Sequence, residues 1–308
     1  MEKVKIKNSE FYFEKGYRDD DKLRKSFNKL AQKTFGINFE IWYDSGYWKE
    51  SYIPYSIIDE GRVVANVSVN IICLNILGEE KSCIQLGTVM TDENYRERGL
   101  SRFLIEKIID EWKDQSDMIY LFANDTVLDF YPKFGFEKEG EYIFYKLMDS
   151  DSGKNNILDK KSEGKSYKKL NMDYKNDRDF LCKKILSSSV NSKLSMINGT
   201  DLIMFYCISL MKENIYYFKD IDTIVIAEVE GDNLIIDAVY SDVEADLDNI
   251  IERIADKNTR RVILGFTPKH TSGYNSEPYH EDDTTLFVLG GSSVFRENKI
   301  KFEPLSYA

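Results

Sequence analysis

The sequence lacks a long hydrophobic run, which limits where the protein can act. None of its 308 residues belongs to an apolar stretch of 18 residues, so no membrane-spanning helix is expected. The first five residues, Met1-Glu2-Lys3-Val4-Lys5, carry charge in place of an apolar signal segment. We therefore predict a cytoplasmic protein that does not enter a membrane.

Positive charge is also in deficit. The chain has 42 Lys and Arg residues against 53 Asp and Glu residues, a net charge of −11 spread over both halves. Nucleic-acid binding needs a basic face, so we predict no nucleic-acid partner. The acidic field would attract a cationic ligand, but it is equally consistent with a protein that is merely soluble and acidic.

Cysteine is scarce and not clustered. The four cysteines, Cys73, Cys83, Cys182 and Cys207, lie in apolar segments without Cys-x-x-Cys spacing. We interpret them as free buried thiols in place of disulfide partners or metal ligands, and we predict no metal site.

The most informative segment is a basic turn, Arg96-x-x-Gly99-x-Ser101, between a predicted strand and a predicted helix. The first amides of a helix have no intrahelical partner, and the helix dipole adds partial positive charge there. Gly99 has no Cβ to obstruct an anion, and Arg96 and Arg98 add full charge. The pattern predicts a pyrophosphate site.

The flanking residues strengthen this prediction. An apolar run of strand length covers 82–90, and apolar residues recur at helical spacing from Leu100 to Trp112. A second strand is predicted over 118–123, followed by a short helix that opens at Asn124. The segment 130–136, Phe-Tyr-Pro-Lys-Phe-Gly-Phe, ends that helix and begins another strand.

These features resemble the GNAT superfamily of N-acetyltransferases, which transfer acetyl from acetyl-coenzyme A to amines. The resemblance rests on Val89-Met90-Thr91, the basic turn, Asn124 and the segment 130–136, and covers about residues 10–148. It implies an α/β (α+β) fold with a mixed, mostly antiparallel twisted sheet flanked by helices. Ser101 stands where the family more often has Gly or Ala, but serine is small and still offers its amide.

The resemblance also implies the binding mode of acetyl-coenzyme A. Pantetheine would pair with the backbone of Val89, Met90 and Thr91, whose amides could polarise the thioester carbonyl. The turn would hold the pyrophosphate, and Asn124 would bond the pantetheine. The predicted cofactor-binding residues are Val89, Met90, Thr91, Arg96, Glu97, Arg98, Gly99, Leu100, Ser101, Arg102 and Asn124.

Catalysis by direct transfer needs an acid for the leaving thiolate, and Tyr131 matches the family's tyrosine. A phenol with a pKa of about 10 stays protonated near neutrality. The alternative is that Tyr131 merely packs the short helix. No base is identified: the amide of Gln85 cannot serve, and His270 and His280 lie in the second half. A water chain or the C-terminal carboxylate of Ala308 is left open.

The segment 39–52 is rich in aromatic residues and corresponds to the family's acceptor region. Trp42, Tyr43 and Trp48 are therefore predicted to bind substrate, because aromatic faces and nearby carboxylates suit an amine. Aromatic packing beneath a helix or against the second domain is the alternative.

The chain length predicts two domains. We assign 1–148 to the acetyl-coenzyme A-binding domain, the polar segment 149–166 to a linker and 167–308 to a second domain. The second half repeats the order hairpin, helix, strand, but its turn over 240–246 has three carboxylates and neither Arg nor Gly. We interpret it as a degenerate GNAT-like α/β domain that does not bind the cofactor; an unrelated α+β domain is the alternative.

The sequence thus predicts an acetyl-coenzyme A-dependent N-acetyltransferase that acts on a small-molecule primary amine, and a cationic amine is one candidate acceptor. A peptide or protein amine, and a homodimer, are left open. The rival interpretations are a non-catalytic GNAT-fold sensor of a coenzyme A ester or amine, and a structural tandem in which neither half binds cofactor.

Overall fold

A computed structural model describes residues 1–148 and 167–308, so the predicted linker 149–166 lies outside the described residues. The first range forms β1 (Glu2–Ile6), β2 (Ser9–Lys15), α1 (Asp21–Phe35), α2 (Glu40–Asp44), β3 (Tyr52–Asp59), β4 (Arg62–Ile76), β5 (Glu79–Thr91), η1 (Glu93–Tyr95), α3 (Leu100–Trp112), β6 (Met118–Ala123), η2 (Asp125–Val127), η3 (Tyr131–Phe134), β7 (Phe136–Lys138) and β8 (Glu141–Leu147).

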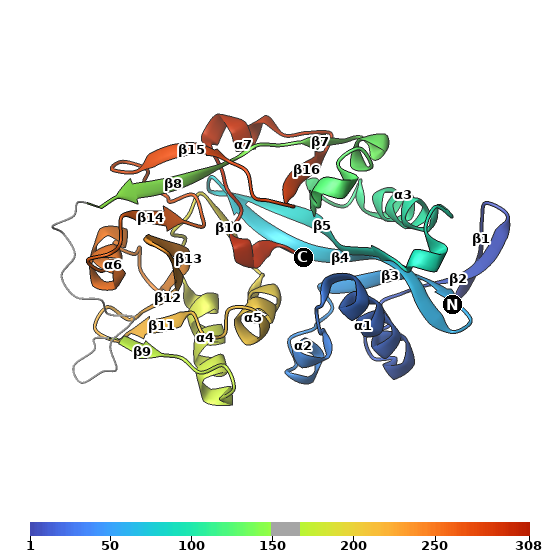
Figure 1. Cartoon of the computed structure of the whole chain (residues 1–308), viewed down its shortest axis with the longest axis horizontal. Coiled ribbons are helices and arrows are strands. Elements are labelled where there is room, and N and C mark those ends of the chain that lie inside the picture. Colours follow the sequence, from blue (N-terminus) through green and yellow to red (C-terminus); the bar gives the residue numbers. More distant parts are fainter. Residues whose placement is uncertain (149–166) are drawn as a thin grey trace.

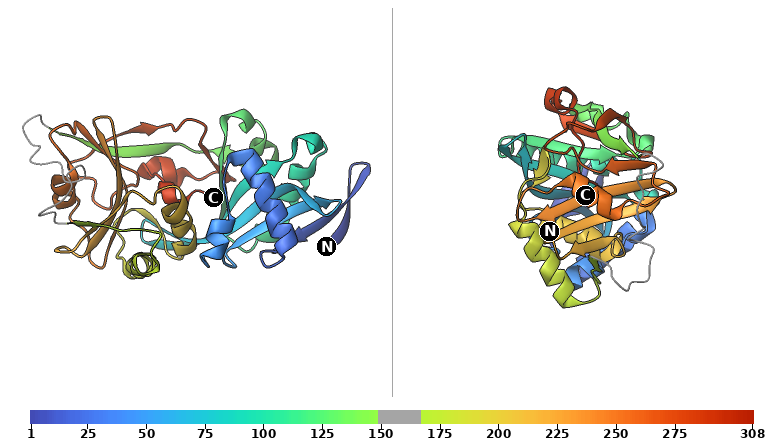
Figure 2. Two further views of the ribbon diagram at one scale, coloured as in Figure 1. Left: turned by 60° about the horizontal axis from the view of Figure 1, so that its bottom comes forward. Right: turned by 90° about the vertical axis from the view of Figure 1, so that its left-hand side faces the viewer.

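The second range forms β9 (Tyr167–Lys169), α4 (Lys175–Ser187), β10 (Leu194–Met196), α5 (Thr200–Ser209), β11 (Ile215–Phe218), β12 (Thr223–Glu230), β13 (Asn233–Ser241), α6 (Leu247–Ile254), β14 (Arg261–Leu264), β15 (Asn275–Tyr279), β16 (Thr285–Leu289), α7 (Ser293–Asn298) and η4 (Pro304–Ser306). The two halves lie side by side along the long axis of the molecule (Figures 1 and 2). The N-terminus is at the far end of the first half, and the C-terminus lies between the halves.

The strands form two mixed, mostly antiparallel sheets flanked by helices, as the resemblance implies. The first sheet has the order β1-β2-β3-β4-β5-β6-β16-β7, with β10 pairing on β4, and the second has the order β15-β8-β14-β13-β12-β11-β9. In each sheet one pair is parallel because a helix connects its strands: β5 with β6 through α3, and β13 with β14 through α6. The second sheet thus repeats the strand order of the first.

The two sheets exchange a strand. β8 continues from β7, yet it pairs with β14 and β15 in the second sheet. In return β16 comes from the second half and pairs with both β6 and β7 in the first sheet. Figure 1 shows green β8 beside orange β14 and β15, and red β16 beside green β7.

The exchange revises the predicted domain boundary. A cut after residue 148 assigns β8 to the first domain and β16 to the second, whereas the backbone hydrogen bonds place each in the opposite sheet. The sequence did not signal this because an apolar strand pattern records which face is buried and not which strand lies beside it.

The core follows the same exchange. Phe287 of β16 is buried in the cluster that also holds Leu104 and Ile108 of α3. A separate buried cluster joins β4, β6 and β16 to Phe295, Ile300 and Phe302 of the C-terminal segment. All four cysteines are free, with Cys83 and Cys207 buried and Cys73 and Cys182 partly exposed.

We predict that residues 1–148 alone do not form a stable domain. Without β16, the facing edges of β6 and β7 lose their hydrogen-bond partners and the first core loses Phe287. Separate expression should give aggregated protein without a cooperative thermal transition, and co-expression with residues 149–308 should restore a soluble complex. A cooperative transition of residues 1–148 on their own would contradict this view of the fold.

Candidate functional site

The centre of the candidate site is the place where β5 and β6 stop pairing. Their parallel pairing runs from Cys83↔Met118 to Leu86↔Leu121 and ends there. One residue later β5 forms a bulge, with Thr88 and Val89 together opposite Val67 of β4. Thr88 adopts φ 46°, which turns the strand out of register. Beyond the bulge β5 still pairs with β4 on one side, and its other edge faces a gap where β6 no longer pairs with it.

A buried polar network fixes this bulge. The Asn66 amide nitrogen donates to the Thr88 carbonyl and to Ser68 Oγ, both at 2.9 Å, and its Oδ1 accepts from Ser56 Oγ at 2.8 Å. The Tyr52 hydroxyl lies 2.6 Å from Thr88 Oγ1. Because buried polar groups are costly when unpaired, the network favours this one geometry of β5.

A pocket of about 980 Å³ opens at the divergence. Ten of the eleven predicted cofactor-binding residues line it, and so does Tyr131. Val89, Met90 and Thr91 form one side, the turn after η1 forms another, and Asn124 stands at the end of β6. The structure thus brings together residues that the sequence places in three separate segments.

The helix α3 points its N-terminus at this pocket. Its N-cap is Gly99 with φ 85° and no side-chain capping bond, so the first amides of the helix stay available. Ser101 Oγ lies 2.8 Å from Thr91 Oγ1, which fastens the helix to the end of β5. An uncapped N-terminus with no Cβ at its entrance is suited to bind an anion.

The pocket is cationic although the chain is acidic. Its lining includes four cationic side chains, Lys7, Arg96, Arg102 and Lys133, against one acidic side chain, Glu97. Arg98 is the predicted residue that does not line it. The Arg98 guanidinium donates to the Asn94 carbonyl at 2.8 Å and stacks 4.7 Å from the Tyr95 ring centroid, so it supports the turn from outside.

Tyr131 begins η3 and is only 3% exposed. Its ring packs against Phe130, Phe136 and Phe287. Within residues 1–148 and 167–308 its hydroxyl has no hydrogen-bond partner, and Tyr131 borders the pocket. Burial raises the pKa of Tyr131 to about 12, which keeps the phenol protonated near neutrality.

Asn124 is held by the second half of the chain. Its Nδ2 donates to Asp283 Oδ2 at 2.7 Å, and the backbone amide of Asp125 donates to Asp283 Oδ1 at 2.9 Å. The bond to Asp283 uses the nitrogen of the Asn124 carboxamide and leaves its oxygen for a ligand.

The sequence analysis missed several pocket residues. Gly87 is one: a Cβ atom there would overlap the backbone carbonyl of Ala308, whose chain enters the gap between β5 and β6. A glycine inside an apolar strand often marks such a close approach, so this signal was present. Lys7 and Lys133 reach the pocket from β-hairpin and η3 positions that no local pattern distinguishes.

The residues considered as a general base differ in whether they line the pocket. Gln85 is fully buried, and its Nε2 donates to the Ser306 carbonyl at 2.9 Å. His270 lies 2.8 Å from Glu244 in the second half, and neither it nor His280 lines the pocket. Of the residues considered from the sequence, Ala308 alone lies in the pocket.

The predicted substrate-binding aromatics need a correction. Trp42 and Trp48 are 2% and 3% exposed, and their indole N–H groups donate to the carbonyls of Asp201 and Tyr52. They pack in a cluster with Phe27, Phe39, Tyr52 and Phe205. Tyr43 holds the Arg24 guanidinium 3.6 Å from its ring centroid. The segment therefore joins α1 and α2 to α5 of the second half, which is the packing alternative.

The equivalent position in the second half is closed to an anion. The helix α6 is capped by Asp246, which accepts from the Asn249 amide at 3.1 Å, and Glu244 lies just before it. The pairing of β13 with β14 also ends early, at Ile236↔Leu264. A Cβ at Gly265, just beyond, would lie 3.0 Å from Asp237 Cα of β13 and 3.2 Å from Pro304 Cδ, so β13 and η4 together fill the space at this second divergence.

Comparison with known proteins agrees with this geometry. Residues 21–138 match the family model of the acetyltransferase (GNAT) domain, so the chain carries a GNAT domain. No curated protein sequence matches the chain.

Solved structures share the fold over nearly the whole chain. A probable N-acyltransferase from Enterococcus faecalis V583 superposes with a TM-score of 0.60 at 14% identity, covering 92% of this chain and 74% of that one. Eis1 from Mycobacterium abscessus gives 0.56 at 11% identity, with the same coverage of 92% and 74%. A GCN5-related N-acetyltransferase from Kribbella flavida gives 0.51 at 12% identity, covering 90% and 71%.

At these identities the likeness concerns the fold. The family match supports an acyltransferase that uses an acyl-coenzyme A donor. Across residues 1–148 and 167–308, every helix is too short or too polar to cross a bilayer.

The Asn66 network generates a testable prediction. Asn66→Ala should lower the free energy of unfolding by about 1–3 kcal/mol more than Asn70→Ala, because it removes the donor to the Thr88 carbonyl and the acceptor of the Ser56 hydroxyl, which then keeps Tyr17 alone. Asn70 is a matched control, being buried on the same strand with an amide nitrogen that has no partner. Urea denaturation of both variants measures the difference, and equal losses would show that the network does not hold the bulge.

Proposed function

We propose that this protein is an acetyl-coenzyme A-dependent N-acetyltransferase that acts on a primary amine by direct attack. The observation that carries the proposal is the divergence of β5 from β6 beside the uncapped N-terminus of α3, within a cationic pocket. This combination offers backbone pairing to an extended pantetheine arm and an anion site to a pyrophosphate. Bound acetyl-coenzyme A would supply an activated acyl thioester.

Each group of pocket residues then has one task. The edge of β5 that faces away from β4, from Val89 to Thr91, would pair with the pantetheine, and its amides would donate to the thioester carbonyl oxygen, where negative charge develops during attack. The first amides of α3 would bind the pyrophosphate, and Arg96 would neutralise part of its charge. The Asn66 network fixes the bulge, so these amides are positioned before acetyl-coenzyme A binds.

Tyr131 is proposed as the general acid. Attack of the amine on the carbonyl carbon expels a thiolate, and the phenol hydroxyl would protonate that sulfur as the carbon–sulfur bond breaks. Its buried, protonated state and its place on the pocket wall support this role. The proton that the attacking nitrogen loses would pass to solvent, from which the Tyr131 phenolate would regain its own, and no side chain is assigned as a general base.

The second half is proposed to be a degenerate GNAT-like domain without a cofactor of its own. Its equivalent helix end is capped by a carboxylate and its strand divergence is occupied by η4. Its contribution to the reaction is indirect, because Asp283 holds Asn124 and β16 completes the first sheet.

The anion site is tested by a matched pair of substitutions at Gly99. Gly99→Asp should weaken acetyl-coenzyme A binding by at least about tenfold relative to Gly99→Asn, which has the same size without the charge. Both residues tolerate the positive φ of this position better than other side chains do. Isothermal titration measures both affinities, and equal affinities would remove the turn from the binding site.

The role of the acid is tested by Tyr131→Phe. The variant should lose turnover by about 10²–10⁴-fold with an amine substrate while acetyl-coenzyme A affinity changes little, because only the proton donor is removed. Thiol release measured over a panel of primary amines gives the rates. Wild-type turnover in the variant would exclude Tyr131 as the acid, and tight binding without turnover of any amine by the native protein would favour the sensor alternative.

A further inference from the structure

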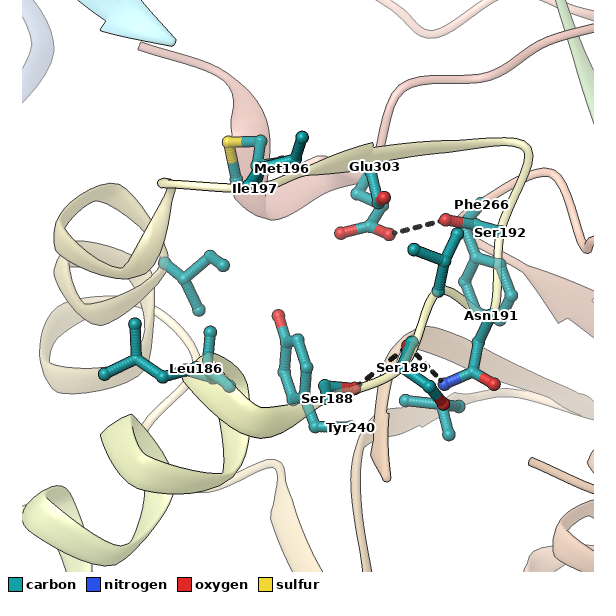
Figure 3. A pocket seen from close by; sticks show the side chains of 15 residues that line it. Leu186, Ser188, Ser189, Asn191, Ser192, Met196, Ile197, Tyr240, Phe266 and Glu303 are labelled. Atoms are coloured by element: carbon teal, nitrogen blue, oxygen red, sulfur yellow. Dashed lines mark hydrogen bonds between the residues drawn. The ribbon is translucent and has the colours of Figure 1, made fainter. Parts of the chain in front are cut away.

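A second cavity lies in the other half of the molecule, away from the donor pocket. Its volume is about 170 Å³, and no lining residue is shared with the donor pocket. The end of α4, the loop after it, β10, β13 and the segment before η4 surround it. Figure 3 shows Glu303 and Tyr240 directed into this space from different sides.

Most polar groups of this cavity are already satisfied by the chain. Ser188 and Ser189 donate to the carbonyl of Ser241 at 3.2 Å. Asn191 Nδ2 donates to the Ser189 carbonyl at 3.1 Å, while its Oδ1 accepts from the Ala245 amide at 2.8 Å. These residues therefore form a wall and offer little to a ligand.

Glu303 is different because its carboxylate has no committed donor. Among the described residues, the hydrogen-bond contact of the Glu303 carboxylate is with Ser192 Oγ at 3.4 Å, but that hydroxyl also lies 2.6 Å from the Leu194 carbonyl. A serine has a single proton, and the shorter contact takes it. In the described parts of the chain no cationic side chain pairs with Glu303, and burial raises the pKa of its carboxyl to about 7.

Tyr240 provides a second unused group. The side chain is 7% exposed, and its hydroxyl has no hydrogen-bond partner among the described residues. Buried hydroxyls are nearly always paired, so an unpaired phenol beside an unpaired carboxylate indicates a site for a polar ligand. The phenol oxygen can accept one N–H bond and the carboxylate several.

The rest of the cavity is apolar. Phe266, Met196 and Ile203 line it inside. At its edge Leu186, Val190 and Ile197 are 71%, 41% and 45% exposed, which is unusual for such side chains. A ligand with an alkyl chain would cover this rim, and a cationic head would meet Glu303.

We propose that this cavity is a binding site for a primary alkylammonium ion, separate from the acceptor site of the proposed acetyl transfer. The ammonium would donate to Glu303, and a small rotation of Tyr240 would bring its enclosed hydroxyl to the same group. The alkyl chain would lie against Leu186, Val190 and Ile197. A neutral alcohol of the same length would fill the apolar part but leave the carboxylate unpaired. The site requires no coenzyme A, so it stands even where the proposed function fails.

The test is a titration of the full-length protein, without coenzyme A, with n-butylammonium chloride and with n-butanol. We expect saturable binding of butylammonium, at least about tenfold tighter than that of butanol. Glu303→Gln and Tyr240→Phe should each weaken butylammonium binding, the former by about tenfold or more. Circular dichroism and thermal melts confirm that both variants are folded, and Glu303→Gln should itself melt at a higher temperature because it removes a half-buried carboxylate that has no paired cation among the described residues.

Gly99→Asp is the control for the other pocket, and it should bind butylammonium like the native protein. Three results would overturn the proposal: no saturable binding of butylammonium, equal binding of butanol, or unchanged binding in folded Glu303→Gln. A clear change of butylammonium affinity in Gly99→Asp, above all tighter binding to the added carboxylate, would place the amine in the donor pocket and would equally exclude the second site.

Discussion

The fold depends on the exchange of β8 and β16 between the two sheets. Each sheet lacks its own strand at the same place, and each is completed by a strand from the other half. The backbone groups of β6 and β7 are satisfied only when β16 lies between them. The halves therefore cannot be separated without exposing strand edges. The same exchange leads the chain after β16 back across the molecule, so that its last residues reach the gap beside Gly87.

The two sheets share a strand order but differ at their divergence points, and this difference is the basis of the functional proposal. In the first sheet the helix after the divergence is uncapped, and the pocket lining is cationic. In the second sheet Asp246 caps the helix, and Pro304 lies against Gly265. One segment, residues 302–308, contributes to both divergence points, because Pro304 lies at the second and Ala308 lines the pocket at the first. The same segment carries Glu303 of the second cavity (Figures 1 and 3).

The sequence predicted what depends on local pattern. The helix from Leu100 and the strand over 118–123 lie where the sequence pattern placed them, and ten predicted cofactor residues share one pocket. The sequence did not predict features that depend on contacts between residues far apart in the chain. Nothing local to 141–147 shows that this strand joins the second sheet. Trp42 is buried because α5, about 160 residues later, covers it, and the orientation of Arg98 follows from the Tyr95 ring beside it.

We propose that the divergence of β5 from β6 binds acetyl-coenzyme A and that the divergence of β13 from β14 does not. Calorimetric titration of the full-length protein with acetyl-coenzyme A tests it most directly, because stoichiometry counts the open sites. We expect one acetyl-coenzyme A site per chain. Two sites would contradict the closure of the second sheet by η4 and Asp246, and no binding would contradict the assignment of the pocket beside Gly99 as a donor site.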